Sequence, residues 1–110
     1  MKRTPEETSP AGKRKPGLTK YVLRLYVSRS TLKSQLAVEN MKRVCEQHLK
    51  GRYDLEVIDI YHQANLARDE QILAVPTLIR RLPLPLRRLV GDMSDLSKVL
   101  FGLDLRTQEP

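Results

Sequence analysis

The chain has 110 residues, 40% of them hydrophobic and 30% charged, with a formal net charge of +7. This length fits one domain with a single modest core. No apolar run approaches the roughly 18 residues that a membrane helix needs, and the polar first residues lack the apolar segment of a secretory signal. We therefore expect a globular cytoplasmic protein without a membrane partner.

The positive charge is concentrated at the beginning of the chain. Residues 1–20 carry six lysines and arginines against two glutamates. Residues 1–17 also hold three prolines and two glycines among almost no apolar side chains, and such a segment cannot bury enough surface to offset its ordering entropy. We expect a disordered basic leader at 1–17, a folded domain at 18–105 and a short tail at 106–110.

The first half of the predicted domain has the pattern of a β-α-β unit. Lys20 to Val27 is rich in β-branched and aromatic residues, as in a buried strand. Ser30 or Thr31 can cap a helix whose apolar residues recur at three- and four-residue spacing, and Gly51 suits the C′ position at its end. Leu55 to Ile60 predicts a second strand, parallel to the first because a right-handed helical crossover joins them.

A short helix and a proline follow this unit. Residues 65–73 predict a helix with an acidic middle that carries Leu66, Ile72 and Leu73 inward. Pro76 ends this helix and begins the next strand, because the residue before a proline is displaced from the helical region.

A hairpin and a last helix complete the predicted domain. Residues 77–82 predict a strand, Pro83-Leu84-Pro85 a turn, and residues 86–90 an antiparallel return strand. Asp92 or Ser94 can cap a final helix, in which Leu96, Val99, Leu100 and Leu103 follow helical spacing. The order β-α-β-α-β-β-α defines an α/β domain and is typical of thioredoxin-like proteins.

Four arginines and no acidic residue lie in the predicted hairpin, at Arg80, Arg81, Arg87 and Arg88. Because side chains alternate along a strand, Arg80 shares a face with Leu78, and Arg81 points to the opposite face. One interpretation is an edge hairpin whose arginines extend their charged ends into water. The other is a basic patch that binds an acidic protein surface, because arginine is over-represented in carboxylate recognition.

The sequence contains no recognisable catalytic or metal-binding set. Cys45 is the single cysteine and falls inside the first helical pattern, where a lone thiol is usually a small buried hydrophobic residue. His48 and His62 are not at metal-ligand spacing. A thioredoxin carries two cysteines where this chain has Ser28 to Lys33, and hydroxyls cannot exchange disulfides. We expect neither an enzyme, a metal nor a cofactor, and an activity of Cys45 acting alone is a distant alternative.

Several segments together resemble the KaiB family, the small clock proteins of the bacterial Kai system. They are YVLRLYV, YDLEVIDI and the run from Ile72 to Leu105, in which Pro-Thr-Leu, Leu-Pro-x-Pro, Arg-Arg, Gly-Asp-x-Ser-Asp and Gly-Leu-Asp-Leu occur in the order of the family. The resemblance covers Tyr21 to Leu105. It implies a non-enzymatic module that binds the KaiC ATPase ring and modulates its phosphorylation cycle.

The resemblance also implies partners and a second fold. Members bind a KaiC-like ATPase, and KaiA or a clock-output histidine kinase are further candidate partners. The family switches between a monomeric thioredoxin-like fold and a ground-state dimer or tetramer whose C-terminal half is rearranged to β-α-α-β. Pro76 matches the family's cis-proline, and Gly102 and Asp104 match positions that bias the switch. Arg87 and Arg88 match its Arg-Arg pair, at which a partner contact is a hypothesis.

Two departures from cyanobacterial members leave alternatives open. The leader is extra, and residues 106–110 hold one acidic residue where those proteins end in an acidic tail. Both features indicate a divergent or non-cyanobacterial homologue, which regulates either a full oscillator or a KaiC-like partner in a stress response without KaiA. The alternative from another class is a basic domain that binds nucleic acid through the leader and the hairpin. It predicts steeply salt-dependent binding.

Overall fold

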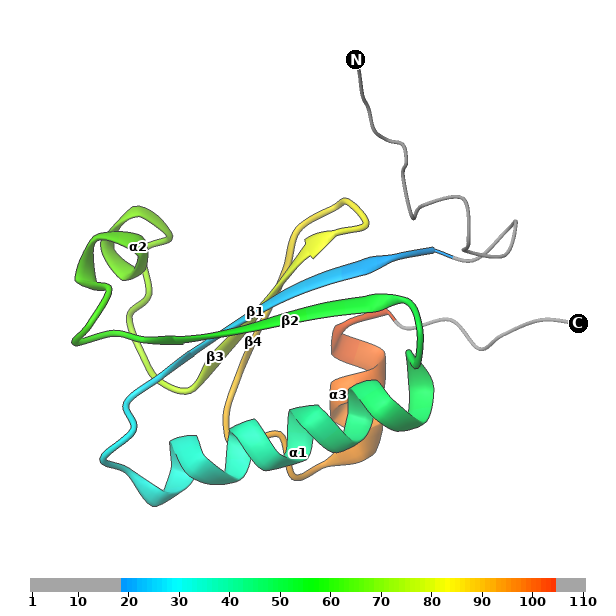
Figure 1. The fold of residues 1–110 in the computed structure, drawn as a ribbon, viewed down its shortest axis with the longest axis horizontal. Helices are drawn as coiled ribbons and strands as arrows, with labels where there is room; N and C mark the ends of the chain where they lie inside the picture. Colours follow the sequence, from blue (N-terminus) through cyan, green and yellow to red (C-terminus); the bar gives the residue numbers. More distant parts are fainter. Residues whose placement is uncertain (1–18, 105–110) are drawn as a thin grey trace, which may run out of the picture.

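The computed structural model describes residues 19–104 (Figure 1), so the predicted leader at 1–17 and tail at 106–110 lie outside the described residues. The predicted order β-α-β-α-β-β-α is confirmed. The elements are β1 (Tyr21–Val27), α1 (Leu32–His48), β2 (Tyr53–Asp59), α2 (Ala64–Asp69), β3 (Thr77–Leu82), β4 (Arg87–Val90) and α3 (Leu96–Gly102).

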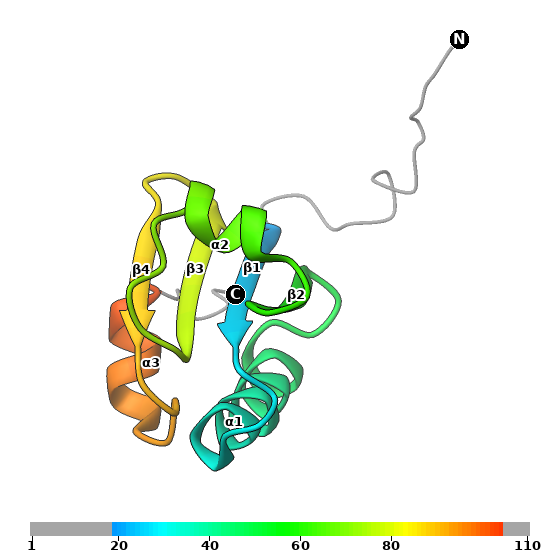
Figure 2. The same cartoon turned by 90° about the vertical axis from the view of Figure 1, so that its left-hand side faces the viewer.

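The strands form one four-stranded sheet in the order β2-β1-β3-β4, which Figure 2 shows from one end. β1 and β2 pair in parallel, as the β-α-β pattern predicted. β3 runs antiparallel to both β1 and β4. The two long parallel strands therefore lie on one side of the sheet and the hairpin on the other, with β2 and β4 as its edges.

The main core lies between the sheet and the two helices α1 and α3, which cover the same face (Figure 1). Alternate residues of β1 point into it, and α1 contributes Ala37, Met41 and Val44. On the hairpin side, Leu78 of β3 and Val99 of α3 complete this core. None of the helices between residues 19 and 104 has the length and apolar character that crossing a membrane requires.

A smaller core lies on the opposite face of the sheet, beneath α2 and the segment that follows it. Tyr26, Ile58 and Ile79 are each fully buried there. Leu66 and Ile72 pack against them, as predicted from the sequence. This second core holds the α2 segment against the sheet and so positions the polar groups of the candidate site.

The ends of the long helix follow the sequence closely. Thr31 is the N-cap of α1, and its hydroxyl accepts a hydrogen bond from the backbone N–H of Ser34 at 3.2 Å. Leu49 is the C-cap. Gly51, predicted at C′, therefore lies one position further along, at C″, and it adopts a φ of +82°, which favours glycine.

Two details of the other helices were predicted wrongly. α3 is capped by Asp95, whose side chain accepts from Lys98 N–H, and not by Asp92 or Ser94. The Asp92 carboxylate instead accepts from the Ser94 N–H at 3.0 Å and closes the preceding turn, so the helix begins later. The predicted helix over 65–73 ends at Asp69.

The early end of α2 also changes the position of Leu73. Gln71 takes a positive φ of 57°, which a helix cannot continue through. The chain therefore turns away, and Leu73 is 96% exposed instead of pointing inward.

Candidate functional site

Arg80, predicted as a partner contact, is buried in this fold. Only 2% of its surface is exposed. Its guanidinium donates hydrogen bonds to the carbonyl oxygen of Leu103, at the C-terminus of α3, and to that of Pro85 at 2.8 Å. A cation at this end of a helix also interacts favourably with the helix dipole. Arg80 thus fastens α3 and the hairpin turn to β3, and no partner can reach it while this fold persists.

Sequence reasoning missed this role, although one signal for it was present. Leu78 and Arg80 were expected on the same face of the strand, and Leu78 is fully buried in the main core. A charge on a core-facing position needs partners. The carbonyl groups that supply them belong to residues 5 and 23 positions away along the chain, and no local pattern places these groups beside Arg80.

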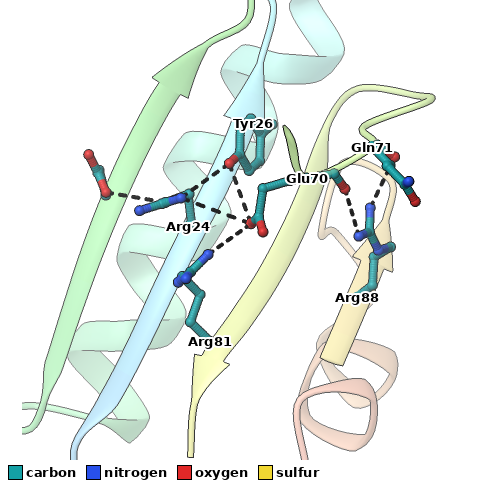
Figure 3. A network of polar contacts seen from close by, with 7 residues as sticks. Arg24, Tyr26, Glu70, Gln71, Arg81 and Arg88 are labelled. Carbon is teal, nitrogen blue, oxygen red and sulfur yellow. Dashed lines mark hydrogen bonds and ion pairs between the residues drawn. The ribbon is translucent and has the colours of Figure 1, made fainter. Parts of the chain in front are cut away.

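Arg81 belongs to a network of polar contacts on the opposite face of the sheet, shown in Figure 3. Its guanidinium lies 3.1 Å from the carboxylate of Glu70, the residue after α2. The same carboxylate lies 4.0 Å from the guanidinium of Arg24 in β1 and accepts a 3.4 Å hydrogen bond from the hydroxyl of Tyr26. Arg24 also pairs with Glu56 of β2 at 3.3 Å. The network therefore ties three strands to the end of α2.

Burial raises the pKa of the Tyr26 phenol above its ordinary value, against a smaller opposing effect of the Arg24 hydrogen bond. The phenol therefore stays protonated and serves as the donor to Glu70. The Glu70 carboxylate accordingly accepts a hydrogen bond from a neutral phenol and pairs with two guanidinium groups. We call the set of Arg24, Tyr26, Glu70 and Arg81 the Glu70 network.

Arg88 holds the backbone that follows Glu70. Its guanidinium donates to the carbonyl oxygen of Glu70 at 2.8 Å and to that of Gln71 at 3.4 Å (Figure 3). These acceptors are neutral, so the charge of Arg88 is not compensated by them. Arg87, on the other face of β4, is exposed, and its side chain forms no ion pair or hydrogen bond with the rest of residues 19–104.

The four predicted arginines thus separate into two groups. Arg80 is internal and structural. Arg81 and Arg88 reach the surface of the β3-β4 hairpin on the α2 face, and Arg87 reaches it on the helix face; we call these three the arginine surface. Arg81 is already paired to Glu70, so the uncompensated positive charge of this surface comes from Arg87 and Arg88.

The mouth of α1, where a thioredoxin has its cysteines, is built from hydroxyl groups. The hydroxyls of Ser28 and Ser30 lie 3.0 Å apart, and the hydroxyl of Thr31 donates to the Ser28 carbonyl while capping α1. The buried Ser34 hydroxyl accepts from the Ser28 N–H at 3.0 Å. These groups satisfy one another and the helix end, which is a structural role.

Cys45 is fully buried, as the helical pattern indicated. Burial, with a smaller effect of the Glu46 carboxylate, raises the pKa of its thiol to about 12. The thiolate is the reactive form of cysteine, and at neutral pH this thiol is therefore protonated and enclosed. Within residues 19–104, no three His, Cys, Asp or Glu side chains gather as they would around a metal ion.

The carboxylates of Asp59 and Asp92 each close a turn by accepting backbone hydrogen bonds. Asp59 accepts from the backbone N–H of Tyr61 at 2.8 Å and of Arg29 at 3.3 Å. These hydrogen bonds, the Tyr61 bond above all, hold the pKa of Asp59 below its ordinary value. Hydrogen bonds from Ser94 lower the pKa of Asp92 in the same way.

The three residues matched to the family's fold switch lie at the boundaries of the C-terminal elements. Pro76 is buried directly before β3 and follows a cis peptide bond. Gly102 ends α3, and a Cβ atom there would lie 2.8 Å from Cδ1 of Leu89 in β4. Asp104 has a φ of +54°, in the left-handed region that favours glycine. The structure does not bring the three into one site.

The structure is similar in fold to thioredoxin-like proteins. The N-terminal domain of SasA from Synechococcus elongatus superposes with a TM-score of 0.65 at 19% identity, covering 88% of this chain and 94% of that domain. Mitochondrial thioredoxin 3 from Saccharomyces cerevisiae superposes with a TM-score of 0.62 at 10% identity, covering 76% and 78%. The predicted thioredoxin-like α/β fold is therefore confirmed.

The sequence comparison is more specific than the likeness of fold. The circadian clock protein KaiB3 of Synechocystis sp. is 44% identical over 88 residues, which cover 80% of this chain and 86% of that protein. A circadian clock oscillator protein KaiB of Prochlorococcus marinus is 48% identical over 89 residues, covering 81% and 83%. The profile of the KaiB domain matches residues 24–105. The chain therefore belongs to the KaiB family of circadian clock proteins.

Proposed function

We propose that this chain is a non-enzymatic clock regulator that binds a KaiC-like ATPase ring and modulates its phosphorylation cycle. The observation that carries the proposal is a thioredoxin-like scaffold without its dithiol. Hydroxyls occupy the mouth of α1, and Cys45 is enclosed. A scaffold that has lost its reactive groups but presents an uncompensated charged surface is suited to binding.

The proposed contact is the arginine surface, Arg81, Arg87 and Arg88. Guanidinium groups form paired hydrogen bonds with carboxylates, and a patch of one charge accelerates encounter with a partner of the opposite charge. Arg80 is not part of the proposed contact because it is buried. A KaiA-like protein or a clock-output histidine kinase is a second partner in the same proposal.

We further propose that the chain exchanges with the family's rearranged oligomeric fold, a dimer or tetramer. Such an exchange requires two packings that differ by only a few kcal/mol. Gly102 and Asp104 support a role at the end of α3. Gly102 permits a close approach to Leu89, and Asp104 holds a left-handed backbone angle that costs more for it than for glycine. Pro76 is carried over from the family pattern.

Size-exclusion chromatography with a KaiC-like hexamer tests this function. The full chain is incubated with the ring in ATP and in ADP for hours, which allows a slow exchange of folds to reach completion. Co-elution with the ring supports the proposal. Separate elution under both nucleotides, at concentrations of tens of micromolar, would reject it.

Nucleic-acid binding has less support than it had from composition alone. Arg80 is internal, Arg81 is paired to Glu70, and Arg88 is bonded to backbone carbonyls. A basic domain of this kind predicts a binding constant that falls steeply with salt. Nucleic-acid binding would be favoured over the clock proposal if the chain bound duplex DNA more tightly than the ring and this binding weakened steeply with salt.

A further inference from the structure

The outer edge of the sheet at β4 offers unpaired backbone groups. In antiparallel strands, residue pairs that exchange hydrogen bonds alternate with pairs that do not. The N–H of Gly91 donates to the carbonyl of Pro76 at 3.0 Å, and the register continues with Val90 opposite Thr77. Leu89 and Arg87 therefore direct their N–H and C=O groups toward β3. Those of Arg88 and Val90 point to the open side.

This edge is not covered within the described part of the chain. β4 is the last strand of the sheet, with no neighbour on its outer side. Val90 is 57% exposed, and both arginines of the strand are exposed. No loop or turn backbone between residues 19 and 104 bonds to Arg88 or Val90. Two residues thus present two donors and two acceptors at positions where an added strand would find them.

The charges beside this edge are all positive. Arg87 has no acidic partner among residues 19–104, and the Arg88 guanidinium bonds only to carbonyl oxygens there. The nearby acids are engaged, because the Glu70 carboxylate is paired with Arg81 and the Asp92 carboxylate accepts from Ser94. These charges therefore favour the addition of a strand that carries acidic side chains.

The register predicts the sequence of such a strand. Arg88 and Val90 lie on the α2 face, and Arg87 and Leu89 on the helix face, because side chains alternate. Residues directly opposite one another across a sheet share a face. An antiparallel partner therefore reads apolar, apolar, acidic, acidic from its N-terminus, opposite Val90, Leu89, Arg88 and Arg87 in turn.

We propose that the outer edge of β4 binds an acidic extended segment of a partner protein by strand addition. Main-chain hydrogen bonds give such complexes affinity, and alternate side chains give them specificity. The inference rests on the proposed function, because it supplies a binding mode for the same arginine surface. A second copy of β4 is the poorer occupant, because it would gather four arginines on one two-stranded ribbon.

A fluorescent peptide with the core Val-Ile-Glu-Glu tests the proposal by anisotropy, with the full chain and no ATPase ring. We expect replacement of both glutamates by lysine to weaken binding at least tenfold. In the antiparallel register, the N–H groups of Val and of the first Glu face β4. N-methylation of either should weaken binding at least tenfold, whereas N-methylation of Ile or of the second Glu should leave it nearly unchanged.

Protein variants locate the site. Arg87→Glu with Arg88→Glu should weaken binding at least tenfold. The matched control Arg43→Glu with Lys50→Glu makes the same change of net charge on exposed α1 and loop positions and should not. In ¹⁵N spectra, the largest shifts on addition of peptide should fall on the Arg88 and Val90 amides.

Several results would overturn the strand-addition proposal. One is equal weakening by both double variants, which indicates non-specific attraction. Another is insensitivity to N-methylation combined with equal or tighter binding of duplex DNA, which indicates a phosphate-binding patch. A third is dimerisation of the free chain through β4, with protected Val90 amides. The peptide assay contains no ring, so its result is independent of the co-elution experiment. If the peptide does not bind but the chain co-elutes with the ring, only the strand-addition mode is rejected. If the chain does not co-elute with the ring, the proposed function is rejected.

Discussion

The buried Arg80 side chain provides the most direct test of how the C-terminal half is held together. We consider Arg80→Met, which keeps most of the aliphatic stem and removes the guanidinium. The change leaves the carbonyls of Leu103 and Pro85 without their donor. It also removes a buried Nε atom that has no hydrogen-bond partner, so part of the loss is offset.

The magnitude follows from these contacts. Each of the two hydrogen bonds from the charged guanidinium contributes about 1.5–3 kcal/mol, so their loss together costs about 3–6 kcal/mol, and relief of the unsatisfied Nε returns about 1–3 kcal/mol. We therefore expect Arg80→Met to lower the free energy of unfolding by about 2–4 kcal/mol. In a domain of this size that corresponds to a fall in Tm of roughly 10–25 °C.

Urea unfolding followed by circular dichroism measures the effect. Arg87→Met is the matched control, because it is the same substitution at an exposed residue without polar contacts, and we expect a change within about 0.5 kcal/mol. Hydrogen exchange should show that α3 loses protection first in Arg80→Met. A destabilisation no larger than that of the control would refute the structural role assigned to Arg80.

Three further predictions concern other described residues. Glu70→Gln removes the carboxylate of the Glu70 network and should lower the free energy of unfolding by about 1 kcal/mol at low salt. In 1 M NaCl the variant and the parent should differ less, because salt screens the ion pairs. The same difference at both salt concentrations would contradict the ion pairing. Because the pKa of Asp59 is lowered in the folded state, its carboxylate stabilises the fold at pH values above the unfolded-state pKa of about 3.9, and this contribution is lost as the pH falls through the folded-state pKa. Asp59→Asn should therefore flatten the dependence of unfolding free energy on acid pH. An unchanged acid profile would count against this role of Asp59. Cys45 should react with a thiol reagent at neutral pH only as fast as the protein unfolds, because it is fully buried with a pKa raised to about 12; rapid stoichiometric labelling of the native protein would show that it is accessible.

The element order followed from the sequence because local patterns and chain direction were consistent. The strand before α1, its Thr31 cap and the stop near Gly51 could each be seen within a few residues. The same locality explains the errors. The end of α2 depends on the positive φ of Gln71, and the cap of α3 depends on how Asp92 closes the preceding turn. Neither is encoded in a short pattern.

The candidate site was less accessible to prediction because it depends on contacts between distant residues. The hairpin arginines were identified as a group. Which of them is internal and which is at the surface depends on where α3 and α2 pack, because Arg80 bonds to the end of α3 and Arg81 pairs with Glu70 after α2. Glu70 was not singled out at all, although it joins Arg24 of β1 to Arg81 of β3. It stands beside Asp69 in a pair of acidic residues that shows no distinctive pattern, and its partners are 46 and 11 positions away.

We propose that the chain binds a KaiC-like ring through the arginine surface of this thioredoxin-like fold. Equilibrium binding to the ring tests this when Arg87→Ser is compared with Arg43→Ser, which makes the same change at an exposed position on α1. We expect Arg87→Ser to weaken binding at least fivefold and Arg43→Ser to leave it unchanged. Equal affinities for the two variants and the parent chain would contradict it.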